Sequence, residues 1–551
     1  MAGGNGTSAL LLDVAAARAA LAAARGGDKL DLLLSAPDPV ALVQALPEQD
    51  LYLALLEIGL DDGRELVSLA SPSQFRHFID MACWPARGEA GPDPSRVLSF
   101  LMLARSTEAS STAALERYRQ KLAELDSELL ALVLRHELTV HELGDDNPDP
   151  ELANPGSTYR TPEGRYLIEF NRGDEHYPQL KALLDDLYAV DVLGTTRMLE
   201  SLRWEMPTEL EESERRWRTG RLRDQGIPEL EEALSFYARP PRKAGTRPPE
   251  APAQATAAVA PGQGAPEQAA AARALVAPRE GPPLLERALA RLEGEERARA
   301  EETIVYAANA AVVAGGAELD DLRAVREAIE GARATLSLGL ELSSQGDEAR
   351  AARVLAELPV KQIFQTAMAE AYRLQTRARA VQKKARLPQA QSVTLLDPPL
   401  AGTVDALAAD RPLFADADVA GSAGARRRPR ALESRADVAR AEALLDEAEA
   451  TIELLDGLGI GPQALGAKAN DAGLGPAALR ASAALRALAL TQLRGEPFSL
   501  RDLTGEERPE PEGFATALDT LLKTAVASAK SPAAARAAAR LRGLFSAPPR
   551  R

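Results

Sequence analysis

Cysteine, aromatic residues and long uncharged apolar runs are all scarce in this sequence. The single cysteine among 551 residues, Cys83, cannot form an internal disulfide, so the fold does not depend on an oxidising compartment and we expect a cytoplasmic protein. Cys83 lies in the apolar phrase Phe78–Trp84, which predicts a buried side chain. Leu10–Leu12 is not preceded by lysine or arginine, so we interpret it as helix rather than export signal. No uncharged apolar stretch of about 18 residues occurs, so we predict no membrane insertion.

Histidine is also scarce, and its positions limit the chemistry that the sequence can support. His77, His136, His141 and His176 all precede residue 177, so roughly two-thirds of the chain lacks the usual base for nucleophilic catalysis. His136 and His141 resemble a zinc-protease pair, but they are five residues apart, whereas a helix presents both rings to one metal at a spacing of four. Gly461–Lys468 has the length of a phosphate loop, but its lysine does not directly follow the second glycine. We therefore predict no metal, no cofactor and no catalytic residue.

The excess of acidic over basic residues argues against binding to nucleic acid. The net charge of −16 and the pI near 5.1 would repel a phosphate backbone or an anionic membrane surface. The basic run Arg426–Arg430 has no aromatic neighbour on which a base could stack. The basic residues from Arg373 to Arg386 end a predicted helix, where positive charge complements the helix dipole. We therefore predict no nucleic-acid partner.

Helix-forming residues are present in excess. Hydrophobic residues make up 45%, charged residues 26% and aromatic residues only 4% of the chain. The common residues are Ala, Leu, Arg and Glu, which lose little side-chain freedom in a helix. A chain of this length can build two or more cores. We predict an all-α fold.

Two helical phrases near the N-terminus repeat 35 residues apart. Leu34–Pro37 aligns with Leu69–Pro72, and in both copies a small or polar residue and the proline are expected to open an amphipathic helix. Helix pairs of this length stack into superhelices, although at least three are normally needed. We therefore predict a superhelical helix-repeat lobe at the N-terminus.

Composition divides the chain into two helical halves. Ten of the 38 prolines lie between Arg239 and Pro283, where aromatic residues are missing, so this segment is predicted to be a linker. The predicted boundaries are 1–28 for an N-terminal helix or tail, 29–238 for the superhelical lobe with a β-hairpin near 138–170, 239–283 for the Pro/Ala-rich linker, 284–386 for a helical lobe, 387–431 for a loop-rich connection and 432–549 for the C-terminal helices.

Hydrophobic periodicity locates several elements in the first half. Apolar residues from Leu115 to Leu132 recur at steps of three and four, which predicts one helix of about five turns. Leu138–Glu142 and Arg165–Phe170 have strand character. Thr161–Gly164 contains the proline and glycine of a tight turn, so the phrase STYR-TPEG-RYLIEF is predicted to form a hairpin that leans on the helices.

The second half is predicted to resume with helices at 284–314, 318–343 and 347–386. Ser434–Asp437 then has the form of a capping box, and the apolar residues from Val438 to Leu455 predict a further helix. We expect Gly457 to close that helix and Pro462 to begin the next one.

Three segments of the sequence resemble a bacterial family of large helical proteins of unknown function. They are SAPDP…LPEQDLYLALLEIGLDD, WEMPTELEESERRWRTGRLRDQGIP and Leu336–Glu341, and the likeness spans most of the chain apart from the linker and the extreme C-terminus. The N-terminal helix pairs are also similar to the cytoplasmic helical N-domain of the bacterial magnesium transporter E, whose leucine- and proline-punctuated helices stack into a superhelix. The nucleotide-binding and membrane domains that accompany that module do not occur in this sequence, so the resemblance does not imply transport. Neither resemblance implies a catalytic residue.

Charged and aromatic residues are densest in Glu211–Asp224. On one helix, ion pairs are expected between Glu212 and Arg216 and between Glu214 and Arg218, and a tryptophan set among these arginines offers a ring on which a guanidinium could stack. Trp and Arg are enriched in interface hot spots. The residues that we predict to contact a protein partner are Arg216, Trp217, Arg221 and Trp204. The alternative is a structural ion-pair network that pins this helix to the hairpin.

The function that these patterns favour is a non-enzymatic helical scaffold or regulatory adaptor that binds a protein partner with the concave face of its first lobe. The alternative is an enzyme, possibly a hydrolase, that uses carboxylates and arginines within 136–224. An enzyme requires at least three of six polar residues to converge in one pocket. The six are His141, His176, Glu205, Arg216, Arg221 and Asp224.

Overall fold

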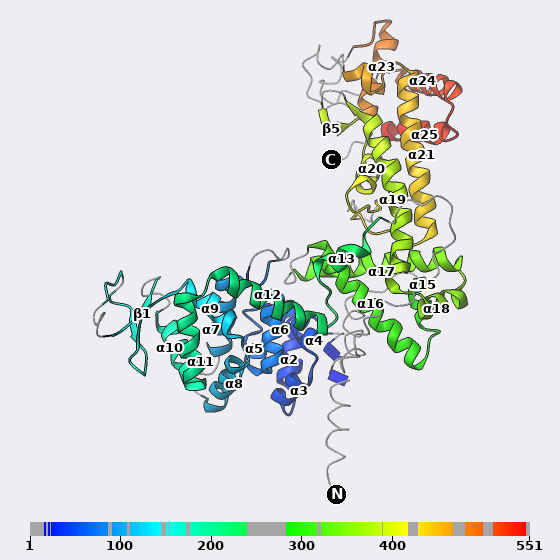
Figure 1. Cartoon of the computed structure of the whole chain (residues 1–551). Helices are drawn as coiled ribbons and strands as arrows, with labels where there is room; N and C mark the ends of the chain where they lie inside the picture. The colour runs from blue at the N-terminus through cyan, green and yellow to red at the C-terminus, as the bar shows by residue number, and fades with distance from the viewer. Residues whose placement is uncertain are drawn as a thin grey trace. The chain divides into compact units, whose positions relative to one another are not determined.

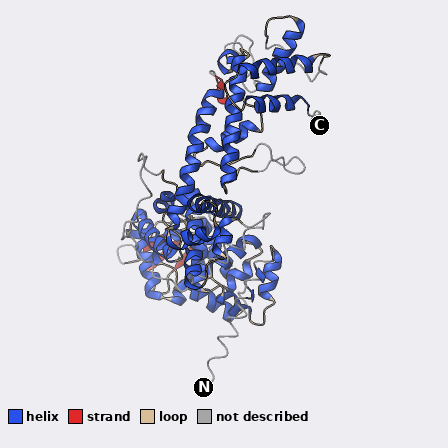
Figure 2. Ribbon diagram, turned by 90° about the vertical axis from the view of Figure 1, so that its right-hand side faces the viewer, coloured by secondary structure: helices blue, strands red, loops and turns tan. Residues whose placement is uncertain are grey.

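Helices dominate the fold, as Figure 2 shows. The computed structural model describes residues 16–17, 20–21, 24–85, 91–106, 111–144, 150–153, 155–171, 177–239, 283–316, 321–387, 390–416, 428–466, 480–499 and 511–546. Within these ranges the only sheets are one of three short strands and one of two, so the prediction of an all-α fold is confirmed. No helix in the described ranges combines the length and the apolar character needed to cross a membrane.

The chain forms two compact units. The first includes Met1–Tyr237 and Leu292–Glu330, and the second includes Pro283–Arg291 and Gly331–Arg551 together with the short stretch that begins at Ala238. The division between the units therefore passes through a helix, α17 (Leu322–Ser344). The predicted linker, apart from its first and last residues, lies outside the described residues.

Helices α2 to α12 of the first unit lie side by side in one stack (Figure 1). Each helix from α2 to α9 packs against the helix two places further along the chain, which is how a helical repeat buries a continuous core. The helices are α2 (Gly27–Leu34), α3 (Pro39–Ala45), α4 (Glu48–Ile58), α5 (Arg64–Leu69), α6 (Pro72–Ala82), α7 (Pro94–Ser106), α8 (Thr112–Ala123), α9 (Ser127–Arg135), α10 (Tyr177–Val190), α11 (Val192–Trp204), α12 (Pro207–Asp224), α13 (Leu230–Phe236) and α16 (Gly294–Gly315).

The two repeated phrases are predicted to begin helices at their prolines, and only the second does so. A capping box begins α6 at Pro72: the Ser71 hydroxyl accepts from the Gln74 N–H, and the Gln74 carboxamide accepts from the Ser71 N–H. In the other copy the helix begins at Pro39, two residues later than predicted. There the carboxylate of Asp38 accepts from a backbone N–H of the first turn at 3.0 Å and provides the cap.

The single helix predicted from Leu115 to Leu132 is wrong, because the chain breaks between α8 and α9. Asp126 takes an extended conformation before α9, and its carboxylate lies 2.7 Å from an Nη1 atom of Arg221 on α12. The apolar residues before and after the break are buried. The apolar spacing in the sequence therefore continues through the break, although the helix stops there. At the break, Asp126 contacts Arg221, which lies 95 residues further along the chain. Hydrophobic periodicity cannot predict a helix break that goes with such a distant contact.

The predicted hairpin is confirmed, and the strand before it joins the same sheet. Strands β1 (Leu138–Glu142) and β2 (Thr158–Arg160) both pair antiparallel with the central strand β3 (Tyr166–Phe170). Tyr166, Ile168 and Phe170 alternate along β3 and are buried in the core of the first unit. Cys83 belongs to the same core and is fully buried, as predicted.

The second unit is built around two long helices, α19 and α21, which pack against each other. A core of Leu, Ala and Phe side chains joins α21 to the helices that follow it. The elements of this unit, apart from its part of α17, are α15 (Leu284–Leu289), α18 (Glu348–Glu357), α19 (Val360–Ala385), β4 (Arg386–Leu387), β5 (Ala390–Thr394), α20 (Leu400–Ala408), α21 (Arg435–Gly457), α23 (Ala481–Arg494), α24 (Phe514–Ser528) and α25 (Ala534–Ser546).

Two of the long helices predicted for the second half are each divided. The helix expected at 284–314 becomes α15 and α16, because Gly294 at the start of α16 has a φ of 54°. The helix expected at 347–386 becomes α18 and α19, because Pro359 forces the preceding residue into an extended conformation. The segment 387–431, predicted to be loop-rich, also contains α20.

The predicted ends of α21 agree with the structure. The Ser434 hydroxyl accepts from the Asp437 N–H at 3.2 Å, which caps the first turn. The helix ends at Gly457, and the following Gly459 takes the left-handed conformation, with a φ of 72°. A short helical segment begins at Pro462 as expected. The rest of the phosphate-loop-like phrase after 466 lies outside the described residues.

Candidate functional site

The inner face of α12 takes part in a cluster of buried and partly buried ionisable side chains, which we call the Arg221 cluster: Arg221, Asp80, Asp126 and Glu214. The Arg221 guanidinium forms two hydrogen bonds with Asp80 of α6, at 2.8 and 2.9 Å. It donates also to Asp126 at 2.7 Å and to Glu214 at 2.8 Å. The side chain of Asp80 is 4% exposed and that of Glu214 is fully buried. The cluster therefore fastens α12 to α6 and to the start of α9.

The ion pairs predicted along α12 do not form as expected. Glu214 pairs with Arg221, and Glu212 pairs with Arg215. Arg218 instead donates to the backbone oxygen of Asp80 at 2.8 Å. Its guanidinium lies 4.8 Å from the ring centroid of Trp84, so the cation–π contact involves a tryptophan of another segment rather than Trp217. The structural alternative predicted a network with the hairpin, but the partners come from the helical stack.

Burial controls the protonation of the Arg221 cluster. Desolvation raises the pKa of Glu214 to about 8, although the positive charge of Arg221 opposes this shift. Burial also lowers the pKa of Arg221, but its hydrogen bonds to Asp80 and its other carboxylate contacts outweigh that effect and raise the pKa overall. The neighbouring His77 is 2% exposed, and desolvation lowers its pKa. Because these side chains are buried, their role is to hold the helices together.

A cavity of about 410 Å³ lies beside Trp84, where α6 ends and α7 begins. Cys83, His136 and Glu211 are among the residues that line it. Cys83 is 0% exposed, which leaves its sulfur closed to a dissolved substrate. Glu211 packs so closely on Gly91 that a Cβ at that position would lie 2.9 Å from the glutamate Cγ. Glu211 therefore lies in the wall of the cavity, packed against Gly91.

The outer side of α11 and α12 exposes large apolar side chains. Trp204 is 75% exposed, Met206 61% and Trp217 59%. Arg216 is also exposed, next to Trp217. We call Trp204, Met206, Arg216 and Trp217 the α11–α12 surface. Three of the four residues predicted to contact a partner lie on it, and the fourth, Arg221, is partly buried among the carboxylates of its cluster.

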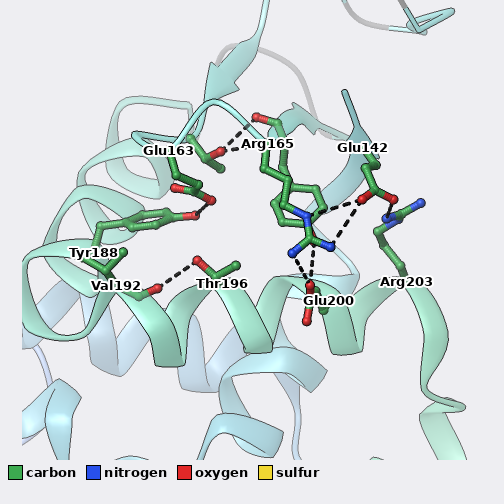
Figure 3. Close-up of polar contacts among 10 residues, drawn as sticks. Glu142, Glu163, Arg165, Tyr188, Val192, Thr196, Glu200 and Arg203 are labelled. Carbon is green, nitrogen blue, oxygen red and sulfur yellow. Dashed lines mark hydrogen bonds and ion pairs between the residues drawn. The ribbon is translucent and has the colours of Figure 1, made fainter. Parts of the chain in front are cut away.

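A second polar network joins the sheet to α10 and α11 (Figure 3). Glu142 of β1 accepts from Arg203 of α11 at 2.6 Å and lies 3.3 Å from Arg165. Arg165 also pairs with Glu200 at 2.7 Å, and the Tyr166 hydroxyl donates to the same carboxylate at 3.0 Å. These contacts, with the hydrogen bond from Tyr188 to Glu163 in the same figure, anchor the hairpin on the helices.

Proton chemistry in this second network is suppressed near neutral pH. Hydrogen bonding to Arg203 lowers the pKa of Glu142, and burial raises the pKa of Tyr166 to about 12. The carboxylate thus stays charged and the phenol stays neutral. Sequence reasoning singled out the strands but missed the pairing of Glu142, Arg165 and Glu200, because the three come from segments whose contact is tertiary.

Of the six residues that would identify a catalytic pocket, five are described, and they lie in different surroundings. His141 lies on β1 and contacts the buried Glu169 at 2.9 Å, whereas Arg221 is enclosed in its own cluster. Glu205, Arg216 and Asp224 are exposed, and His176 lies outside the described residues. Within the described ranges, no three His, Cys, Asp or Glu side chains are grouped so that they could hold a metal ion.

Comparison with known proteins identifies the family of this chain. It belongs to a family described as "Family of unknown function (DUF6178)", whose sequence profile matches residues 7–540. The match covers nearly the whole chain, including both units. No curated protein and no solved structure matches it.

Proposed function

We propose that this protein is a helical adaptor that binds a protein partner through the α11–α12 surface. The observation that carries the proposal is the exposure of Trp204 at the end of α11, of Met206 before α12 and of Trp217 on α12. Large apolar side chains that lie together on a folded surface mark interaction sites. Tryptophan and arginine are also the residues that most often dominate binding energy at protein interfaces.

The interior beneath the α11–α12 surface favours the same function. The Arg221 cluster fixes α12 against α6 and α9, and α11 also packs on α9. A surface held rigid in this way loses little conformational entropy on binding. The exposed side chains would therefore contribute most of their contact energy to affinity.

We also propose where the adaptor acts, what kind of role it has and what kind of partner it binds. We propose that it works in the cytoplasm, since its one cysteine is buried and unpaired. The helical stack of the first unit supports a role as a scaffold or regulatory adaptor. The net charge of −16 favours a protein partner over nucleic acid.

The test is affinity capture from native lysate with the full-length chain, followed by quantitative binding of the captured protein. We expect Trp217→Ala and Trp204→Ala each to weaken that binding at least about 30-fold, the equivalent of a 2 kcal/mol hot spot. Leu493→Ala is the matched control, because Leu493 is an exposed apolar side chain, at 42%, in the second unit. Binding that survives both tryptophan changes, or the absence of any specific partner, would overturn the proposal.

A further inference from the structure

Met206 differs from the other methionines that the structure describes, because its side chain is open to solvent. The chain has six methionines, of which the N-terminal one lies outside the described residues. Met206 is 61% exposed, whereas Met81, Met198 and Met368 are at most 6% exposed. Met102 is half-buried and packs against the core of the first unit. A small reagent dissolved in water therefore has the freest access to the thioether of Met206.

The position of Met206 lets its side chain change without disturbing the fold. Its backbone oxygen accepts from the N–H groups of Glu209 at 3.0 Å and Leu210 at 3.3 Å, and it thereby begins α12. These bonds do not involve the side chain, which takes no part in the hydrophobic core of the first unit. In the sequence Met206 lies between Trp204 and Trp217, the two tryptophans of the α11–α12 surface. A chemical change at the Met206 sulfur thus alters that surface and leaves the core intact.

The chemistry available to an exposed thioether is oxidation by hydrogen peroxide. The sulfur lone pair attacks one oxygen of the peroxide, an S–O bond forms as the O–O bond breaks, and the other oxygen leaves as water with both protons. Sulfur loses two electrons, peroxide is reduced, and the product is the sulfoxide, which methionine sulfoxide reductases convert back to the thioether. The one thiol of the chain is closed to the same reagent, because Cys83 is 0% exposed.

We propose that Met206 is a reversible oxidation site through which peroxide weakens binding at the α11–α12 surface, an inference that rests on the proposed function and adds its regulation. The sulfoxide replaces an apolar, flexible side chain by a polar one. Burying its oxygen against an apolar partner, without a hydrogen-bond donor, costs free energy that the thioether does not cost. Trp204 and Trp217 remain in place, so the affinity falls while the first unit stays folded.

The first test measures where the full-length chain is oxidised. The chain is exposed to hydrogen peroxide for increasing times, and peptide mass spectrometry measures the sulfoxide at each methionine. We expect Met206 to react at least about tenfold faster than Met81, Met198 and Met368, because burial protects the other three. In urea that unfolds the chain, the four rates should become similar. Equal rates in the folded chain would overturn the assignment of Met206.

The second test measures the consequence for binding to the partner obtained by affinity capture. For the unaltered chain we expect peroxide to weaken binding about tenfold, with recovery after treatment with methionine sulfoxide reductase. Met206→Leu cannot form the sulfoxide, so its affinity should be the same before and after peroxide, whatever its starting value. Met102→Leu is the matched control, because it removes a half-buried methionine of the same unit, and it should respond to peroxide as the unaltered chain does. The urea midpoint of the oxidised chain should be unchanged.

The outcomes separate this inference from the proposed function. If Met206 is oxidised but the partner binds equally well before and after, the regulation is wrong, whereas the adaptor function still stands on the effects of Trp204→Ala and Trp217→Ala. If peroxide weakens binding of Met206→Leu as much as that of the unaltered chain, another residue is responsible and Met206 is not the site. If no specific partner is captured, the proposed function fails and the regulation fails with it, while the oxidation rates still decide whether Met206 is the residue that peroxide modifies.

Discussion

The replacement Arg221→Met tests whether the Arg221 cluster supports the first unit. It removes the cation that bonds Asp80, Asp126 and Glu214, and it leaves the carboxylate of Asp80, which is 4% exposed, without the two hydrogen bonds from Arg221. Breaking a buried ion pair from one side costs about 3–5 kcal/mol, because the partner charge stays buried and uncompensated. We expect the free energy of unfolding of the first unit to fall by that amount.

Tryptophan fluorescence during urea unfolding measures this loss in the right part of the molecule. All three tryptophans of the chain, Trp84, Trp204 and Trp217, belong to the first unit. With an m value of about 3 kcal/mol per M, the midpoint should fall by about 1–1.7 M urea. The matched control is Arg223→Met, which removes an exposed arginine from the same helix. A midpoint for Arg221→Met that equals the control value would refute the structural role of Arg221.

The pH dependence of the same variant provides an independent check. The pKa of Glu214 is about 8 in the folded chain and 4.5 ordinarily, so between these values the folded chain holds a proton that the unfolded chain has released. Glu214 therefore makes stability fall as the pH rises from about 4.5 to 8. Loss of Arg221 raises the folded pKa further and extends the fall above pH 8. We expect the destabilisation by Arg221→Met to be larger at pH 9 than at pH 7, and equal values would contradict this reasoning.

Two further predictions concern the packing of α17 and the buried lysine of α8. Gly339→Ala should destabilise the second unit by more than about 2 kcal/mol, because its Cβ would lie 2.1 Å from the backbone oxygen of Ile363. Gly331→Ala is the control and should be neutral or stabilising, because the heavy atom nearest to its Cβ would lie 4.0 Å away. Circular dichroism during urea unfolding compares the stability of the two variants. Burial lowers the pKa of Lys121 to about 7 from an ordinary 10.5, so the unfolded chain binds this proton more tightly and stability should rise by about 1.4 kcal/mol per pH unit between these values. The Nζ of Lys121 donates to the backbone oxygen of Ser68 at 2.7 Å. Lys121→Met should remove the rise of stability with pH when unfolding is followed by fluorescence at pH 7.5–9.5. An unchanged rise would show that Lys121 is not its source.

Local sequence patterns predicted the elements that local forces determine. The turn residues Thr161–Gly164 located the hairpin, and Ser434 located the start of α21. Both signals act within a few residues, because a capping hydroxyl or a turn glycine satisfies or bends the backbone beside it. The same patterns missed the break between α8 and α9, where apolar spacing continues through Asp126 although the helix does not.

The candidate site shows the same division between local and long-range effects. Sequence reasoning selected α12 and its arginines and tryptophans, but it paired Glu214 with Arg218 rather than with Arg221. It also could not foresee that Asp80, 141 residues away, would supply two of the hydrogen bonds to Arg221. A guanidinium binds whichever carboxylate lies within reach, and reach is set by the stacking of α6, α9 and α12.

The sequence by itself determined that this protein is a stack of amphipathic helices with one small hairpin, because helix propensity and hydrophobic period act over a few residues. Only the tertiary structure decided which side of α11 and α12 is buried and which remains open. That choice depends on where distant helices pack, and it encloses Arg221 while leaving Trp204 and Trp217 exposed.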